Sequence, residues 1–178
     1  MTKIAVFVGS LRKDSINMHA AQQIERLLPE GTNFAYADLS QIPLYNTDLE
    51  ADFPASVQAV KDLVESSDGV LFVTPEHNRG VPAVLKNAID WTSRPWGSNS
   101  FNGKPAAIAG ASGPLGTTQA QQQLRNTLLY LNTKLMGQPE MYINAHGGTY
   151  DENGDISAES KEFFQTFVDA FVAHVQRG

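Results

Sequence analysis

Short apolar runs alternate with stretches of helical periodicity along this chain of 178 residues. Apolar positions that fill four to eight successive residues, rich in β-branched and aromatic types, are typical of buried strands. We predict strands over residues 3–8, 33–39, 69–74, 104–109 and 140–144. The third run, GVLFVT, is apolar on both faces, so we expect it at the centre of a sheet.

The remaining segments mostly repeat apolar residues every three or four positions, as amphipathic helices do. They predict helices over residues 20–28, 55–66, 82–91 and 119–136, and from about residue 157 to the end. The sequence PEG at 29–31 stops the first helix, and Pro82 suits the first position of the third. In the fourth, the apolar stripe consists of Leu124, Leu128, Leu131 and Leu135. Residues 44–54 predict a long polar loop.

Five strands, each followed by a helix, predict a parallel sheet with helices on both faces. Right-handed crossovers leave few topologies, and the flavodoxin-like strand order 2-1-3-4-5 suits this length. We therefore expect a doubly wound, flavodoxin-like α/β fold that forms one domain over residues 1–178. Because the first and third strands are neighbours in this order, we expect a ligand at the loops after strands one, three and four.

Composition and charge exclude several kinds of chemistry. The chain has no cysteine, which excludes disulfides, thiolate nucleophiles and cysteine-ligated metals, and its four scattered histidines form no HExxH pair. A net charge of −6 without a basic cluster makes nucleic acid and anionic membranes poor partners. No apolar run approaches the ~20 residues that span a bilayer, and the N-terminus leads directly into a strand pattern. We therefore expect a cytoplasmic protein without a bound metal.

The loop after the first strand, GSLRKDSIN at 9–17, combines a glycine with several hydrogen-bond donors and a helix start. Ser10, Arg12, Ser15 and Asn17 can donate, and the free N–H groups at a helix N-terminus suit a phosphate. An ordinary turn in which Ser15 caps the helix explains the same residues equally well. The loop matches neither GxGxxG nor GxxxxGK[ST], so a Rossmann-type dinucleotide or a nucleoside triphosphate is not expected here.

Two further loops follow the third and fourth strands. In TPEHNRGVP at 74–82, two prolines and a glycine favour a fixed shape whose backbone N–H groups can flank a flat ring; a stiff connector is the alternative. GASGPLG at 110–116 lets the backbone approach a ligand closely, or is a tight turn into the next helix. It lacks the GxSxG pattern of a nucleophile elbow. DENGD at 151–155 lacks the spacing of an EF-hand and predicts a surface turn.

These loops resemble those of the NADPH-dependent FMN reductases, a family that includes bacterial quinone, azo-dye and chromate reductases. GSLRxxSxN at 9–17 is similar to the phosphate loop of that family. PEHN at 75–78, followed by the PxxLKNAIDW helix at 82–91, is similar to its second signature, in which the loop is PEYN. IPLY at 42–45 and GKP at 103–105 also match, so the similarity extends over essentially the whole chain.

The resemblance implies a non-covalent FMN. It implies that the phosphate and nearby atoms are bound by residues of the first loop, namely Ser10, Arg12, Ser15, Ile16 and Asn17. The isoalloxazine ring would be bordered by Pro75, Glu76, His77 and Asn78, mainly through their backbone, with Ser112 or its neighbours near the pyrimidine end. It also implies a homodimer, in some members paired into tetramers, with FMN near the subunit interface.

Several positions depart from the family pattern. Asp14 stands where glycine is frequent, His77 replaces the usual tyrosine, Ala83 replaces a frequent glycine, and Arg79 is unusual at its position. If His77 lines the ring, its protonated imidazole would stabilise negative charge on the reduced ring. A side chain that points to solvent, with only its backbone used, is the alternative.

The activity that the resemblance implies is hydride transfer from NADPH or NADH through bound FMN to a small acceptor. The acceptor would be a quinone, an azo dye, a metal oxyanion or free flavin. We expect no catalytic side chain, because the flavin carries the chemistry, and a ping-pong scheme in which both substrates use one ring face in turn. Two alternatives are a flavodoxin-type electron carrier without turnover of its own and a non-redox binding protein that reuses the fold.

Overall fold

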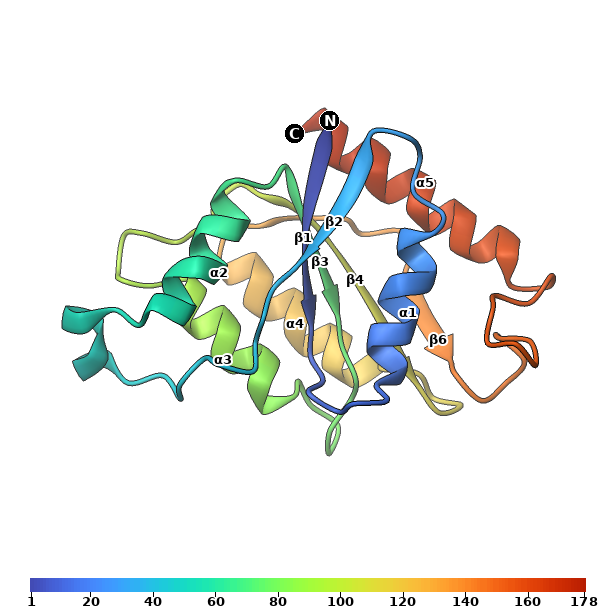
Figure 1. The fold of residues 1–178 in the computed structure, drawn as a ribbon, viewed down its shortest axis with the longest axis horizontal. Helices are drawn as coiled ribbons and strands as arrows, with labels where there is room; N and C mark the ends of the chain where they lie inside the picture. Colours follow the sequence, from blue (N-terminus) through green and yellow to red (C-terminus); the bar gives the residue numbers. More distant parts are fainter.

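The computed structural model describes all residues from Met1 to Gly178, and its strands form one parallel sheet (Figure 1). The strands are β1 (Thr2–Val8), β2 (Thr32–Tyr36), β3 (Gly69–Val73), β4 (Pro105–Ser112), β5 (Lys134–Leu135) and β6 (Met141–Asn144). Five of them follow the order β2-β1-β3-β4-β5, and β6 also pairs with β4. The flavodoxin-like order 2-1-3-4-5 is therefore confirmed, with one strand more than the sequence predicts.

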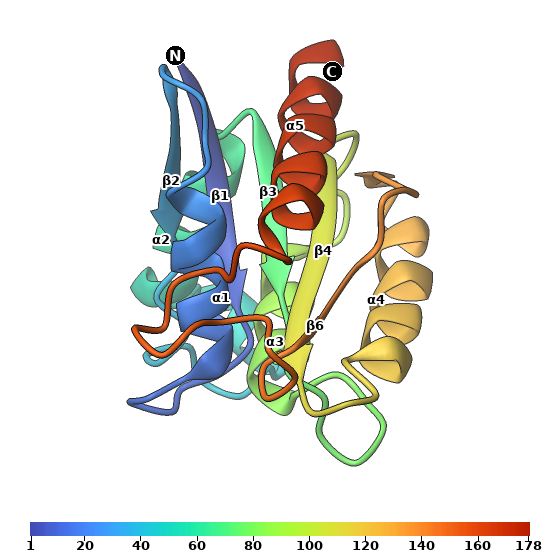
Figure 2. The same cartoon turned by 90° about the vertical axis from the view of Figure 1, so that its right-hand side faces the viewer.

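Helices cover both faces of this sheet (Figure 2). They are α1 (Ile16–Glu25), the 3₁₀ helix η1 (Thr47–Asp52), α2 (Ala55–Glu65), α3 (Ala83–Thr92), α4 (Thr118–Tyr130) and α5 (Lys161–Arg177). Helices α1 and α5 share one apolar core with the sheet, and α2, α3 and α4 share the other. Successive side chains of a strand point to opposite faces, so Val6 of β1 packs in the first core and Phe7 in the second.

The prediction of a helix over residues 119–136 is wrong about where the helix ends. Helix α4 ends at Tyr130, because Asn132 adopts a left-handed φ of 57°. The N–H of Thr133 then bonds to the carbonyl of Leu128 at 3.0 Å, which closes the last turn in the Schellman manner. Leu135 consequently lies in β5 and not on a helical stripe.

Two strands, not one, form the sheet edge beside β4. β5 pairs with the start of β4 at Pro105 and Ala106, and β6 pairs with its end, residues 109–112. The segment between β5 and β6 contains Pro139, which has no N–H to contribute to a strand ladder. The predicted strand at 140–144 is thus found as β6, and the two-residue β5 was missed.

Other boundaries differ from the prediction by a few residues. The strand predicted over 33–39 ends at Tyr36, the one predicted over 104–109 continues to Ser112, and the last helix begins at Lys161 instead of near 157. The predicted polar loop at 44–54 contains η1. None of these differences changes which strand or helix precedes each loop.

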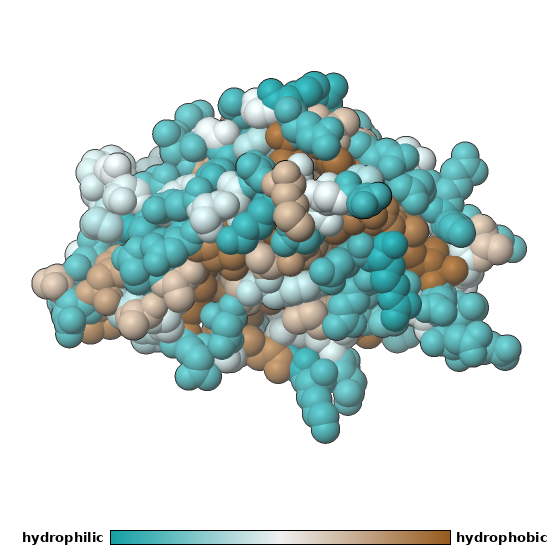
Figure 3. Space-filling model, turned by 45° about the horizontal axis from the view of Figure 1, so that its top comes forward, coloured by the Kyte–Doolittle hydropathy of each residue, from teal (hydrophilic) through white to brown (hydrophobic).

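The two ends of the sheet differ in character. The carboxyl ends of the strands and the loops that follow them lie at the lower end of Figure 1, and both chain termini lie at the other end. The end with the termini, which comes forward in Figure 3, is mostly hydrophilic, with hydrophobic residues visible between hydrophilic ones. None of the helices combines the length and the apolar character needed to cross a membrane.

Candidate functional site

Three loops meet at the carboxyl end of the sheet: the β1 loop (residues 9–15), the β3 loop (74–82) and the β4 loop (113–117). Strand β1 pairs with β3 up to its last residue, Val8, and β3 pairs with β4 up to Val73, opposite Ala109, whereas β4 itself continues to Ser112. The N–H of Gly9 also bonds to the carbonyl of Val73 at 2.9 Å. The β1 and β3 loops therefore leave adjacent strands at one level, and the β4 loop begins further along at the same end of the sheet, where ligands of doubly wound folds bind.

The β1 loop presents donors that no protein acceptor uses. Ser15 caps α1 by accepting the N–H of Met18 at 3.2 Å, and Ser10 Oγ accepts the N–H of Arg12 at 3.4 Å. Both hydroxyls accept in these bonds, so their hydrogens stay free to donate. Arg12 is exposed and belongs to no ion pair, and Asp14 is exposed and does not cap the helix.

Helix α1 is attached firmly where it begins. The buried amide of Asn17 donates to the carbonyl of Ala111 and accepts the N–H of Ala111, both at 2.9 Å. This reciprocal pair joins the first turn of α1 to the end of β4. In that turn the backbone N–H groups of Ile16 and Asn17 have no acceptor in the chain, as expected for a helix start.

The β3 loop contains a tight turn at residues 77–80. The N–H of His77 bonds to the carbonyl of Gly80 at 3.1 Å, and the N–H of Gly80 returns to the carbonyl of His77 at 2.9 Å. Between them Asn78 and Arg79 adopt left-handed φ values of 50° and 65°, which makes this a type I′ turn. The side chain of His77 is exposed and forms no hydrogen bond, so the turn uses only its backbone.

Glu76 ties the β3 loop to α4. Its side chain is 7% exposed, and one carboxylate oxygen accepts the N–H groups of Gln119 and Ala120 at 2.9 and 3.1 Å. The other oxygen pairs with the guanidinium of Arg79 at 3.2 Å. A carboxylate at a helix N-terminus is electrostatically favourable. Glu76 is thus a capping residue for α4, a role that its place in the sequence does not indicate.

Gln123 of α4 is a second residue that sequence reasoning missed. Its amide donates to the carbonyl of Arg79 at 3.0 Å and accepts the N–H of Val81 at 3.2 Å. It therefore ties the type I′ turn to α4. Its partners lie more than 40 residues earlier in the chain, so no local pattern could have revealed it.

The β4 loop completes a cavity of about 330 Å³, which is lined by Glu76, Asn78, Arg79 and residues 112–116. Strand β4 ends at Ser112, whose carbonyl accepts the N–H of Ala145 at 2.9 Å. Of the predicted site residues, the cavity brings together Glu76, Asn78 and Ser112, whereas Pro75 and His77 do not line it.

The helix sequence NAIDW at 87–91, part of the second signature that resembles the family, makes structural contacts. Trp91 is fully buried, and its indole N–H donates to the carbonyl of Pro43 at 2.8 Å. Asn87 donates to the same carbonyl at 2.9 Å and accepts the N–H of Tyr45 at 2.8 Å. The helix therefore anchors the IPLY segment, and Trp91 is not free to stack on a bound ring.

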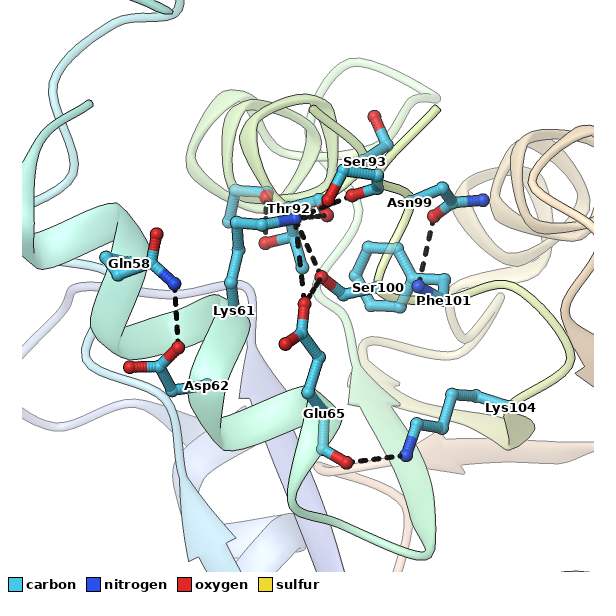
Figure 4. A network of polar contacts seen from close by, with 12 residues as sticks. Gln58, Lys61, Asp62, Glu65, Thr92, Ser93, Asn99, Ser100, Phe101 and Lys104 are labelled. Carbon is cyan, nitrogen blue, oxygen red and sulfur yellow. Dashed lines mark hydrogen bonds and ion pairs between the residues drawn. The ribbon is translucent and has the colours of Figure 1, made fainter. Parts of the chain in front are cut away.

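A second polar centre surrounds the buried ammonium group of Lys61 (Figure 4). It donates to the carbonyls of Thr92 and Ser98 at 3.0 and 2.8 Å and to the hydroxyl of Ser100 at 2.8 Å. Burial is the main reason why the pKa of Lys61 lies below its usual value. Because α3 runs back from the loops towards the amino end of the sheet, its last residue, Thr92, places this network away from the three loops.

The chemistry of the β1 loop fits a phosphate group. Two hydroxyls, an unpaired guanidinium and free N–H groups belong to the same loop at the start of a helix, and donors of these kinds suit a phosphate. No residue of the β1 loop lines the cavity between the β3 and β4 loops, but the three loops follow the neighbouring strands β1, β3 and β4 at the same end of the sheet. The donors of the β1 loop therefore suit the phosphate group of a cofactor such as FMN.

Comparison with known proteins identifies the family of this chain. Residues 2–147 match the family model of the NADPH-dependent FMN reductases. The chain is 47% identical over 176 residues to a 2-hydroxy-1,4-benzoquinone reductase from a Burkholderia species, covering 98% of this chain and 96% of that protein. It is 41% identical over 178 residues to an NAD(P)H-dependent FMN reductase from Pseudomonas aeruginosa, with coverage of 98% and 96%.

A solved structure extends the similarity to three dimensions. FerB from Paracoccus denitrificans, a flavoenzyme NAD(P)H:(acceptor) oxidoreductase, matches with a TM-score of 0.94 and 44% identity. The match covers 99% of this chain and 98% of that one. This chain therefore belongs to the NADPH-dependent FMN reductase family and is an enzyme that uses FMN and NAD(P)H.

Proposed function

We propose that this reductase passes hydride from NADPH or NADH to quinones, with azo dyes, metal oxyanions and free flavin as further acceptors. Bound FMN supplies the hydride chemistry, and residues 1–178 act as one FMN-binding domain. The observation that carries the proposal is the unused donor set of the β1 loop beside the cavity of about 330 Å³. The Burkholderia relative, named for 2-hydroxy-1,4-benzoquinone, supports a quinone as acceptor.

The β1 loop would hold the FMN phosphate. Ser10 and Ser15 donate through their hydroxyls, Arg12 through its guanidinium, and Ile16 and Asn17 through their backbone N–H groups. The side-chain amide of Asn17 is engaged by Ala111, so we assign it the role of fixing the start of α1. Hydrogen bonds to a charged group contribute about 1.5–3 kcal/mol each, which makes this loop the main source of FMN affinity.

The β3 and β4 loops would border the ring. The turn at residues 77–80 fixes the backbone of Pro75 to Asn78, and Asn78 keeps both its N–H and its side-chain amide free of protein partners. Ser112 faces the same cavity from β4. We assign His77 a spacer role in this wall, because its backbone is bonded within the turn and its side chain is exposed.

The reaction would follow a ping-pong scheme, because one cavity has to admit both the nucleotide and the acceptor. Initial rates measured while NADPH and 1,4-benzoquinone are varied should give parallel double-reciprocal lines. Intersecting lines would contradict the shared site. Absence of any NADPH oxidation in the FMN-loaded protein would instead favour the electron-carrier function, which the flavodoxin-like fold alone also permits.

We further propose that the enzyme is at least a homodimer. Three large hydrophobic side chains are mostly exposed near the ends of α3 and α4: Trp96 (80%), Leu129 (74%) and Tyr130 (73%). Trp96 and Tyr130 also line a hollow of about 420 Å³. Exposed apolar surface of this kind favours association, and a second copy presents the same side chains. A monomer in light scattering at micromolar concentration would contradict this proposal.

A further inference from the structure

Arg79 places a positive charge at the edge of the cavity between the β3 and β4 loops. Its side chain is 65% exposed, and its guanidinium has one protein contact, the carboxylate of Glu76 at 3.2 Å. A guanidinium carries five N–H donors, so most of them stay available to a ligand. Arg79 and Glu76 are the only charged side chains that line the cavity.

The backbone of Arg79 is held in an unfavourable conformation. A left-handed φ of 65° is uncommon for a residue other than glycine, asparagine or aspartate, and it persists where the surroundings enforce it. Two features enforce it here: the paired bonds between His77 and Gly80, and the bond from Gln123 to the carbonyl of Arg79. The base of this side chain is therefore fixed at the cavity although its end is exposed.

For a ligand, the negative charge of Glu76 does not cancel the positive charge of Arg79. Two N–H groups at the start of α4 bind one oxygen of Glu76, and the positive end of the helix dipole lies against the same carboxylate. The carboxylate is also nearly buried, at 7% exposed, whereas the guanidinium is 65% exposed. A small molecule in the cavity thus meets the cation rather than the anion.

We propose that Arg79 determines specificity for acceptors that carry a negative charge, namely ring-hydroxylated 1,4-benzoquinones. A hydroxyl on the quinone ring is a vinylogous carboxylic acid and is ionised at neutral pH. Its charge is shared between oxygens, which suits the planar fork of a guanidinium. Because the flavin ring would lie in this cavity, the quinone would meet Arg79 at the cavity edge, where its guanidinium is exposed.

The charge also matters for the reaction. An anionic quinone is electron-rich and resists further electron density, so a neighbouring cation favours hydride transfer to it. The overall step consumes one NAD(P)H, two protons and the quinone anion, and yields NAD(P)⁺ and neutral 1,2,4-trihydroxybenzene. The two electrons and one hydrogen come from NAD(P)H, and the two protons come from solvent. This inference rests on the proposed quinone reductase function.

Binding to the oxidised, FMN-loaded enzyme tests the inference without turnover, because neither partner can then donate hydride. The probes are 2-hydroxy-1,4-benzoquinone and its neutral analogue 2-methoxy-1,4-benzoquinone, titrated against the flavin spectrum. The chain has no cysteine, so quinone addition to a thiol does not disturb the titration. The variants are Arg79→Gln, Arg79→Asn and Arg79→Lys. The matched control is Arg26→Gln, since Arg26 is 64% exposed and paired with Asp155 at 2.6 Å, away from the cavity.

We expect Arg79→Gln and Arg79→Asn to weaken binding of the hydroxyquinone about tenfold or more and to leave the methoxyquinone within about twofold. Arg79→Lys should restore part of the loss, and Arg26→Gln should change neither dissociation constant. Asparagine tolerates the left-handed conformation. Equal losses of affinity in the Gln and Asn variants would therefore show that the loss comes from the missing charge and not from backbone strain.

Two results would overturn the inference: equal loss for both quinones, or no loss for either. Neither outcome contradicts the proposed reductase function, because that function is tested separately by the rate of NADPH oxidation with 1,4-benzoquinone. A different result would contradict the proposed reductase function. In that case no quinone is reduced by the wild-type enzyme, whatever residue stands at position 79.

Discussion

Tyr150 carries a buried hydroxyl that has no hydrogen-bond partner. Its ring packs edge-on against His19, and burial raises its pKa to about 12. In the unfolded chain a tyrosine ionises near pH ~10, so above that pH the unfolded state loses a proton that the folded state keeps. The contribution of Tyr150 to stability is therefore complete below pH ~10 and is lost as the pH rises towards 12.

We predict that Tyr150→Phe reduces alkaline destabilisation. Between pH 8 and pH 11 the free energy of unfolding of the wild type should fall by roughly 1 kcal/mol more than that of the variant. At pH 8 the variant should be at least as stable, because it removes an unsatisfied buried hydroxyl. Urea titrations at both pH values measure this, with Tyr130→Phe as the exposed control. Equal alkaline losses in wild type and Tyr150→Phe would contradict the prediction.

At the residue scale, local patterns reveal some of the candidate site. Ser15 as the helix cap and the donors around it follow from short spacings within one loop. The capping role of Glu76 and the clamp formed by Gln123 do not, because their partners lie 43 and 44 residues away. The bonding of the Asn17 side chain to Ala111 cannot be predicted for the same reason, since the two residues are 94 positions apart in the chain.

Among the elements, α2 and α3 are held together by the buried ammonium group of Lys61. Its three acceptors are two carbonyls and a hydroxyl, from Thr92, Ser98 and Ser100, and Ser100 also donates to Glu65 at 2.7 Å. Removing the ammonium takes a donor from all three and leaves the carbonyl of Ser98 without a partner, whereas the carbonyl of Thr92 keeps the N–H of Ser100 at 3.3 Å. The segment that follows α3, which presents Trp96, depends on this anchor.

We therefore predict that Lys61→Met lowers the free energy of unfolding by about 2–3 kcal/mol. The matched control is Lys86→Met, which removes an exposed pair with Asp90 at 2.7 Å and should cost no more than about 0.5 kcal/mol. Denaturant unfolding of both variants is the measurement. A loss for Lys61→Met as small as that of the control would show that the network contributes no net stability.

The element pattern shows where sequence reasoning is limited. Strands β1 and β3 were predictable because each is a continuous apolar run between recognisable stops. The end of α4 was not, because leucines at 131 and 135 continue the helical spacing beyond the turn at Asn132. Strand β5 has two residues and is defined only by its pairing with β4, so no pattern along its own sequence predicts it.

For the whole molecule, topology was the most predictable property. Alternating strands and helices with right-handed crossovers leave few arrangements, and the observed order is the expected one. That order places the β1, β3 and β4 loops together whatever the details of each loop. The identity of the acceptor is less predictable, because the family resemblance does not extend to every side chain at the cavity: Arg79 lines it and departs from the family pattern.

Binding of FMN and riboflavin to the apoprotein tests most directly whether the β1 loop binds the phosphate of FMN. The two flavins differ only in the phosphate, so flavin fluorescence titrations should show FMN bound far more tightly than riboflavin. Arg12→Ala should weaken FMN about tenfold or more without changing riboflavin, and Arg26→Ala, near the other end of α1, should change neither. Equal affinity for the two flavins, or an unchanged FMN affinity in Arg12→Ala, would contradict the account.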